Sequence, residues 1–326
     1  MTRPRFQAIG ALVPRGGTLR WRQVSFPAVM FIALLTGFTL LSDKFLTFDN
    51  AMIVLQQAVP LLVVGLGMTF VIIGGSIDLS VGSIVALAAL ASAATSGTLG
   101  VASIIPAALV GIACGLLNGV VFAKGKVPSF IATLGAMVAY RGVVLFFTRG
   151  SPVSITDAGY LDVFSGRTFG FPNAALIAFV VLAVGYVMLN HTVFGREVRA
   201  IGGGERVALL TGIRVARAKI WMFAFLGILA GLAGLLQGAR VQAATSQLGQ
   251  GLELDVIAAV VVGGTPLTGG VGSVQGTILG AFIITILASG MNMIGVDPYL
   301  QSIVKGLVLV VAVFVTIDRK KIGIMK

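Results

Sequence analysis

The sequence predicts an all-α membrane protein with about ten transmembrane helices. Of its 326 residues, 57% are hydrophobic and only 10% are charged, and the mean hydropathy is +1.04. A soluble domain carries far more charge, so this composition places the chain in a bilayer. The apolar residues also fall into runs of about 20, the length that a helix needs to cross a hydrocarbon core of about 30 Å.

Most of the apolar segments are long enough to span the membrane, and one is short. The long segments lie at 26–42, 51–73, 81–97, 101–123, 128–147, 172–190, 219–238, 274–294 and 299–317. The short one, 253–265, runs into the glycine-rich stretch VGGTPLTGGVGS. Apolar segments of this length are more often re-entrant or broken than simple spans, so irregular backbone is expected there before a full crossing is complete. Ten crossings would place both termini on the same side.

The distribution of basic residues supports an even number of crossings, with both termini on one side. The net charge is +12, but the charges occupy short gaps between apolar segments and do not predict a nucleic-acid surface. Cytoplasmic loops of membrane proteins are enriched in Lys and Arg. A cytoplasmic N-terminus would place all 23 basic residues inside except Lys44, Arg141, Arg149, Arg167, Arg240 and Lys305. Both termini are therefore expected in the cytoplasm.

This topology divides the chain into a transmembrane domain at 26–318 and two cytoplasmic tails, at 1–25 and 319–326. The first apolar segment follows an arginine-rich tail and lacks a small-residue cleavage site, so we expect it to be retained. The loop at 148–171 is expected to face the opposite side from the tails.

Small residues recur at every fourth position in several spans. Gly111, Gly115 and Gly119 lie in the fourth span, and Gly227 and Gly231 lie in the seventh. Such spacing lets helix backbones approach closely, so a tightly packed bundle is expected.

The longest charged segment on the expected inner side is HTVFGREVRAIGGGERVALLTGIRVARAK, residues 191–219. An ordinary connection between helices needs only a few residues, so this length indicates a docking surface, with a solvated loop as the alternative. Within it, ERVALLTGIRV can form a short amphipathic helix, and Gly203 and Gly204 would break the chain just before it. The apolar residues of this helix would lie on one stripe: Val207, Leu210 and Ile213.

The stretch IIGGSIDLSVGS places a carboxylate and helix breakers inside apolar sequence. Gly74 and Gly75 should end the second helix, and Asp78 or Ser80 can cap the next one by accepting a hydrogen bond from a first-turn N–H. A carboxylate at a membrane boundary also marks a transport pathway. Both interpretations of Asp78 stay open.

Glu253 and Asp255 begin the short helix of LELDVIAAVVVGG. Acids in a first turn stabilise a helix by opposing its dipole, but acids at membrane depth also mark transport sites, and both alternatives stay open. Arg141 and Lys305, each inside a span, are candidate partners. For Lys305 we favour the alternative that its ammonium group reaches an interface along its flexible stem.

The sequence shows no set of residues that is typical of a catalytic site. His191, the single histidine, stands beside no cysteine or carboxylate cluster, and Cys114 is the only cysteine. Neither a metal cluster nor an intrachain disulfide is therefore expected, and no cofactor is indicated. The phosphate-binding motif G-x-x-x-x-G-K-[ST] is also missing, so any ATP would be hydrolysed by another chain.

Several blocks, in order, together resemble the ribose-type permease subunit of bacterial ABC sugar importers, within the branched-chain amino acid/monosaccharide permease family. They are GMTFVIIGGSIDLSVGS, VPSFIATLGAMVAYRGV, FGREVRAIGGGERVALLTGIRV and LELDVIAAVVVGGTPLTGGVGSVQGTILGA, and the resemblance covers about residues 45–318. The chain departs from the family pattern twice. Ser76 replaces the second glycine of SGGIDLSVG, and Gly204 stands where asparagine is common.

The resemblance implies a type II ABC importer-like bundle in a bacterial inner membrane. It also implies a second permease copy, a cytoplasmic ATP-binding subunit and a periplasmic sugar-binding protein. GGGERVALLTGI would dock on the ATP-binding subunit, with Glu205 and Gly212 at recognisable positions. The coupling residues would be Glu205, Val207, Leu210, Gly212 and Ile213.

A permease also needs polar side chains along its pathway or gate. The candidates are Asp78, Ser80, Asn118, Thr133, Arg141, Gln237, Glu253 and Asp255. The main alternative function is an ion-coupled secondary transporter of a small polar solute, in which Asp78, Glu253 or Asp255 would couple to protons or sodium. A membrane enzyme is disfavoured, because no acid, base and nucleophile converge in the sequence.

Overall fold

The computed structural model describes residues 17–316 of the chain and the side chains of residues 27–314. The expected tail at 319–326 and most of the tail at 1–25 lie outside the described residues. The rest of the N-terminal tail, from Gly17, is already part of the first helix.

The described chain is helical apart from two very small sheets. Its helices are α1 (Gly17–Leu41), α2 (Phe48–Ile73), α3 (Val81–Leu99), the 3-10 helix η1 (Gly100–Ser103), α4 (Ile104–Ala123), α5 (Ser129–Thr148), α6 (Ala158–Ser165), α7 (Asn173–His191), α8 (Val193–Gly203), α9 (Glu205–Leu210), α10 (Val215–Val241), α11 (Leu252–Val262), α12 (Val274–Met293) and α13 (Pro298–Thr316). Each of the apolar segments predicted as a span or short helix overlaps one of these helices.

An all-α polytopic membrane protein is confirmed, whereas about ten transmembrane helices are not. Among the described residues, 6 helical ranges are long and apolar enough to cross a membrane: Phe48–Ile73, Val81–Ala123, Ser129–Thr148, Asn173–His191, Val215–Val241 and Val274–Met293. The second range joins α3 and α4 through η1. Pro27–Leu41 and Pro298–Phe314 are shorter apolar helices. Helix α11, with 11 residues, is only about 16 Å long at about 1.5 Å per residue.

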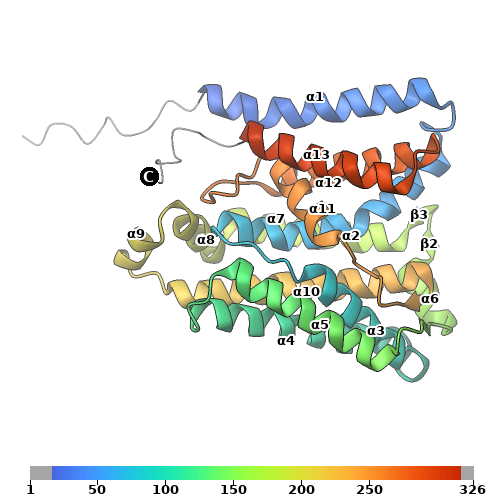
Figure 1. Ribbon diagram of the computed structural model, residues 1–326, viewed down its shortest axis with the longest axis horizontal. Coiled ribbons are helices and arrows are strands. Elements are labelled where there is room, and N and C mark those ends of the chain that lie inside the picture. Colours follow the sequence, from blue (N-terminus) through green and yellow to red (C-terminus); the bar gives the residue numbers. More distant parts are fainter. Residues whose placement is uncertain (1–16, 317–326) are drawn as a thin grey trace, which may run out of the picture.

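The long helices run roughly along one axis of the molecule (Figure 1). Helix α10 packs against α2, α3 and α4, and its glycines face those of α4. A Cβ atom on Gly111 would overlap the carbonyl oxygen of Gly227, and one on Gly115 would overlap that of Phe223. The predicted close approach of these two helices is therefore confirmed, because only hydrogen atoms fit between their backbones.

The two ends of the bundle differ in structure. Helices α8 and α9 lie at one end, which is also where α1 begins and α13 ends (left in Figure 1). Helix α6 and the hairpin of β2 (Arg167–Thr168) and β3 (Phe171–Pro172) lie at the other end. There, Tyr160 of α6 is fully buried and its hydroxyl group contacts the Ser92 hydroxyl at 2.8 Å, which fixes α6 to α3.

A second antiparallel pair ties two connections together. Strand β1 (Val153–Ser154) follows α5, and strand β4 (Ala243–Ala244) follows α10. Val153 is opposite Ala244 in this pair. The connection after α10 is thereby held close to the end of α5.

Candidate functional site

The turn between α2 and α3 begins with two glycines, as the sequence predicts. Gly74 is the C-terminal cap of α2; its N–H donates to the carbonyl oxygen of Phe70, and the N–H of Gly75 donates to that of Ile72, both at 2.9 Å. Gly75 has φ +77°, a left-handed conformation that glycine adopts without steric cost. The chain then passes through Ser76 to the buried Asp78, whose side chain is 0% exposed.

Asp78 is surrounded by hydrogen-bond donors. Its Oδ1 atom accepts from the backbone N–H and from the hydroxyl group of Ser80, both at 2.7 Å. Asn118 of α4 donates through Nδ2 to Ser80 Oγ at 2.8 Å and to Asp78 Oδ2 at 3.3 Å. Tyr140 of α5 in turn donates its hydroxyl hydrogen to Asn118 Oδ1 at 3.0 Å. These bonds compensate for the removal of the carboxyl group from water.

Of the two interpretations left open for this turn, capping of α3 by Asp78 or Ser80 is wrong. Ser80 is the N-cap residue of α3 but makes no side-chain cap bond, because its hydroxyl group donates to Asp78 instead. Asp78 accepts from Ser80 itself and from no N–H of the first turn of α3. In this connection between α2 and α3, burial raises the pKa of Asp78, while hydrogen bonds from Ser80 and Asn118 lower it.

Helix α5 holds the same turn through two further hydroxyl groups. The backbone N–H of Leu79 donates to Thr133 Oγ1 at 3.0 Å, and that of Ile77 donates to Ser129 Oγ at 3.3 Å. These carboxylate, carboxamide and hydroxyl groups form one set across the α2–α3 connection, α4 and α5, with Ser129 and Tyr140 partly exposed and the others buried. We call this set the polar cluster: Asp78, Ser80, Asn118, Ser129, Thr133 and Tyr140.

Sequence reasoning identified four members of the polar cluster and missed Ser129 and Tyr140. Both missed residues lie in the block VPSFIATLGAMVAYRGV, on the same side of α5 as Thr133. Their spacing from Thr133, four residues before and seven after, is the helical repeat that brings side chains to one face, and it is the signal that could have found them.

Arg141 is anchored to the backbone rather than to an acid. Its guanidinium group donates through Nη1 to the carbonyl oxygens of Ser246 at 2.5 Å and Leu248 at 2.8 Å. It thereby fixes the connection between α10 and α11 to α5. Glu253 lies beside α3, since a Cβ atom on Gly82 would be 2.5 Å from its Oε2 atom.

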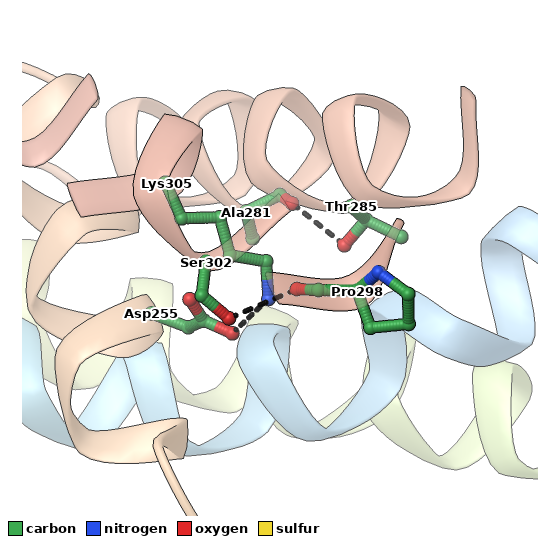
Figure 2. A network of polar contacts seen from close by, with 6 residues as sticks. All are labelled: Asp255, Ala281, Thr285, Pro298, Ser302 and Lys305. Atoms are coloured by element: carbon green, nitrogen blue, oxygen red, sulfur yellow. Dashed lines mark hydrogen bonds and ion pairs between the residues drawn. The ribbon is translucent and has the colours of Figure 1, made fainter. Parts of the chain in front are cut away.

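Asp255 has the partner that the sequence offered as a candidate. Lys305 of α13 donates to Asp255 Oδ2 of α11 at 2.9 Å, and the two side chains are 29% and 24% exposed, respectively (Figure 2). The partner role, which the sequence left as the less favoured alternative for Lys305, is therefore confirmed. Ser302, one turn earlier on α13, donates to the Pro298 carbonyl oxygen at 3.2 Å.

Gln237 joins none of these groups through a hydrogen bond. Its Oε1 atom is buried in α10 and has no hydrogen-bond partner within the described part of the chain. The pathway candidates therefore separate into the polar cluster, the Arg141 anchor with Glu253 nearby, the Asp255–Lys305 pair, and Gln237.

Helix α9 is the short helix that the sequence predicts in the charged segment. Helix α8 ends at Gly203, and Gly204 separates it from α9. Val207 and Leu210 are 65% and 80% exposed. Leu209, which the predicted stripe did not include, is 62% exposed beside them. We call Val207, Leu209 and Leu210 the apolar tip.

Ile213 does not belong to the predicted stripe. The helix ends at Leu210 and the chain turns at Gly212, where φ is +85°. Ile213 therefore packs inward, against a small core of buried residues from α8, α9 and α10. That core contains Ile201, Ala208, Val215 and Ala218.

An ion pair fixes α9 to the bundle. Lys219 Nζ in α10 lies 2.7 Å from Glu205 Oε2 and 4.5 Å from the ring centroid of Phe122 in α4. The Lys219 side chain is only 11% exposed, so it is held between these two partners. A hollow of about 500 Å³ beside α9 is lined by Lys124, Leu209, Arg214, Val215, Ala216, Arg217 and Ile220.

Comparison with known proteins gives consistent matches over most of the chain. A family model described as branched-chain amino acid transport system / permease component matches residues 50–313. The ribose import permease protein RbsC of Escherichia coli (strain K12) is 40% identical over 310 residues, which cover 93% of this chain and 96% of that protein. Its namesake in Bacillus subtilis (strain 168) is 40% identical over 287 residues, covering 87% and 88%.

A xylose permease is similar over a comparable range. The xylose transport system permease protein XylH of Escherichia coli (strain K12) is 34% identical over 364 aligned positions, covering 92% of this chain and 93% of that protein. No solved structure matches the chain.

Proposed function

The chain belongs to the family of branched-chain amino acid transport system permease components, and we propose that it forms the monosaccharide pathway of an ATP-driven importer. Its similarity to ribose and xylose import permeases over nearly its whole length carries this assignment. As a permease subunit of an ABC sugar importer it moves the solute and leaves ATP hydrolysis to another chain. The ion-coupled secondary transporter is not favoured.

The partner that hydrolyses ATP would bind at helix α9. The apolar tip exposes most of the surface of three large aliphatic side chains at one end of the bundle. Burial in a groove of a partner would remove that surface from water. The Glu205–Lys219 ion pair supports this role, because it holds α9 against α10 and α4 and lets a force on α9 reach the bundle.

We propose a bacterial inner-membrane location with α9 and both termini in the cytoplasm. The basic residues of the segment 191–219 and the common end of α1, α9 and α13 support this orientation (Figure 1). The 148–171 connection, with α6 and the β2–β3 hairpin, would then receive the sugar from a periplasmic binding protein. A second permease copy would complete the pathway, with ten crossings in each copy.

The polar cluster is proposed as a gate on the sugar pathway. It joins the start of α3 to α4 and α5 through hydrogen bonds, and its core members Asp78, Ser80 and Thr133 are 0% exposed. Separation of these helices would break the bonds from Asn118 to Asp78 and Ser80 and leave the Asn118 carboxamide without partners, while Asp78 keeps its two bonds from Ser80. The hydroxyl groups of a sugar can both donate and accept hydrogen bonds, so a passing monosaccharide can replace the lost partners.

Reconstitution tests this function directly. The chain is placed in proteoliposomes with its ATP-binding partner and its sugar-binding protein, and uptake of radiolabelled D-ribose and D-xylose is followed. We expect uptake to require ATP and to persist when an ionophore abolishes the proton and sodium gradients. Uptake that needs a gradient and proceeds without ATP would instead establish the secondary transporter. The purified chain alone is expected to hydrolyse no ATP.

A further inference from the structure

Three segments that are distant in sequence meet at a contact made of backbone. They are the end of α2, the end of α8 and the loop between α11 and α12. The N–H of Gly270 in this loop donates to the carbonyl oxygen of Ile73 at 2.8 Å. A Cβ atom on Gly202 of α8 would overlap both that carbonyl oxygen and the backbone nitrogen of Gly270.

The neighbouring glycines extend the same contact. A Cβ atom on Gly269 would lie 3.0 Å from the Cα atom of Gly75, and one on Gly270 would lie 3.2 Å from that of Gly203. Gly269 and Gly270 have φ of +79° and +81°, so side chains are also disfavoured there by backbone conformation. We call Ile73, Gly75, Gly202, Gly269 and Gly270 the glycine junction.

A contact between backbones transmits displacement differently from one between side chains. Long side chains change rotamer and absorb a shift, whereas atoms in direct backbone contact must move together or separate. The glycine junction has a hydrogen bond between two of its segments and no room for a Cβ atom between α8 and the others. A shift of α8 is therefore passed to Ile73 and to the Gly269–Gly270 turn.

The glycine junction lies between the two functional regions. Gly202 is in the last turn of α8, and only Gly203 and Gly204 separate it from α9. Ile73 ends α2, five residues before Asp78 of the polar cluster. Gly270 is close in sequence to α12, which begins at Val274. A route of covalent bonds and direct backbone contacts from the apolar tip to Asp78 therefore runs through Gly202 and Ile73.

We propose that Gly202 and Gly270 are positioning residues that carry the displacement of α9 to the turn containing Asp78. This inference rests on the proposed function, in which a partner moves α9 and the polar cluster opens. In this arrangement the end of α8, the end of α2 and the 269–270 turn move as one body. The absence of a side chain at residue 202 is what keeps them in contact.

Adjacent glycines of α8 provide a matched pair of variants. Gly202→Ala puts a methyl group into the glycine junction, whereas a Cβ atom on Gly203 meets nothing within 4 Å. Both substitutions replace a glycine in the last turn of the same helix. In proteoliposomes with both partners, we expect Gly202→Ala to lower the sugar transported per ATP hydrolysed at least tenfold. Gly203→Ala is expected to stay within twofold of the wild type.

The proposal would be overturned if Gly202→Ala retains its ATP-binding partner and transports as much sugar per ATP hydrolysed as the wild type. The function itself is tested separately by the wild type: if wild-type sugar uptake is independent of ATP, the importer assignment fails. Loss of coupling in Gly203→Ala to the same extent as in Gly202→Ala would also overturn the role of the glycine junction, since that methyl group has open space.

Spin labels decide the question if Gly202→Ala does not reach the membrane or loses its partner. Labels are attached at Gly203→Cys and Val271→Cys, and separately at Gly203→Cys and Gly135→Cys, in a Cys114→Ala background that keeps Gly202 and Gly270. On ATP binding, the 203–271 distance should stay constant while the 203–135 distance changes. A changed 203–271 distance, or no change in either pair, contradicts the proposal.

Discussion

Lys305 and Asp255 are fifty positions apart in sequence and join α13 to α11 through an ion pair of 2.9 Å (Figure 2). Helix α11 is too short to cross a bilayer by itself, and it packs against both α12 and α13. The pair therefore fixes a short helix, whose first turn is acidic, to a longer neighbour. The carboxylate also lies near the N-terminus of α11, where the helix dipole favours negative charge.

Removal of Lys305 should destabilise the bundle more than removal of both charges. Lys305→Met leaves the Asp255 carboxylate without its partner, and we expect a loss of about 1–3 kcal/mol, reduced from the value for fully buried pairs because both groups are partly exposed. The double variant Asp255→Asn, Lys305→Met should recover most of the lost free energy of unfolding. Thermal unfolding in detergent measures the effect, with Ser302→Ala as control. Additive effects of the two substitutions would contradict the coupling.

The polar cluster should respond unequally to two substitutions. Tyr140→Phe removes one hydroxyl group, and we expect a loss of about 1 kcal/mol. Asn118→Leu removes the donor to Asp78 Oδ2 and Ser80 Oγ and leaves the Tyr140 hydroxyl group only the Cys114 carbonyl oxygen, so it should cost about 2–4 kcal/mol and strongly reduce uptake. Unfolding and uptake are measured on the same preparations. Equal effects of the two variants would show that Asn118 does not organise the cluster.

A charge on the apolar tip should separate the chain from its ATP-binding partner. Leu210→Asp puts an unpaired charge on a surface that has to be buried, so we expect loss of co-purification and of uptake at normal membrane levels. Thr211→Asp adds the same charge at the next, also exposed, residue and should retain most binding. If Leu210→Asp keeps its partner and transports normally, α9 is only part of a solvated connector.

Labelling of single cysteines tests the orientation. In a Cys114→Ala background, a membrane-impermeant thiol reagent added to intact cells should label Arg167→Cys on the β2–β3 hairpin. Arg206→Cys on α9 should be labelled only after the cells are permeabilised. Labelling of Arg206→Cys in intact cells would overturn the cytoplasmic assignment of the segment 191–219.

Ser76 offers a stabilising substitution. Its hydroxyl oxygen is buried and has no hydrogen-bond partner within the described residues, while the residue itself is only 4% exposed. Ser76→Ala keeps the Cβ atom and removes the unpaired polar group, so we expect a gain of up to about 1 kcal/mol in thermal unfolding. Thr133→Val is the comparison, because it removes a hydroxyl group that accepts from Leu79 and should destabilise. A loss of stability in Ser76→Ala would indicate that its hydroxyl group is paired.

Helix positions were predictable because their causes are local. The runs of apolar residues end at glycines, prolines and charges, and Gly74 and Gly75 stop α2 where the sequence indicates. The short helix at 252–262 and the break before α9 follow from the same signals. The family resemblance could also be detected from the sequence, because it lies in contiguous blocks that follow one another in the order typical of the family.

The sequence by itself determined the membrane class, the all-α architecture and the residue types of the candidate site. Only the tertiary structure decided which of these residues meet. Asp78 could have capped α3, but Asn118 and Tyr140 approach from α4 and α5 and draw Ser80 into a different set of bonds. Ile213 was placed on a stripe because helical spacing was assumed to continue, whereas the turn at Gly212 sends it inward. Periodicity describes one helix at a time, and contacts such as Gly202 with Ile73 depend on how separate helices pack.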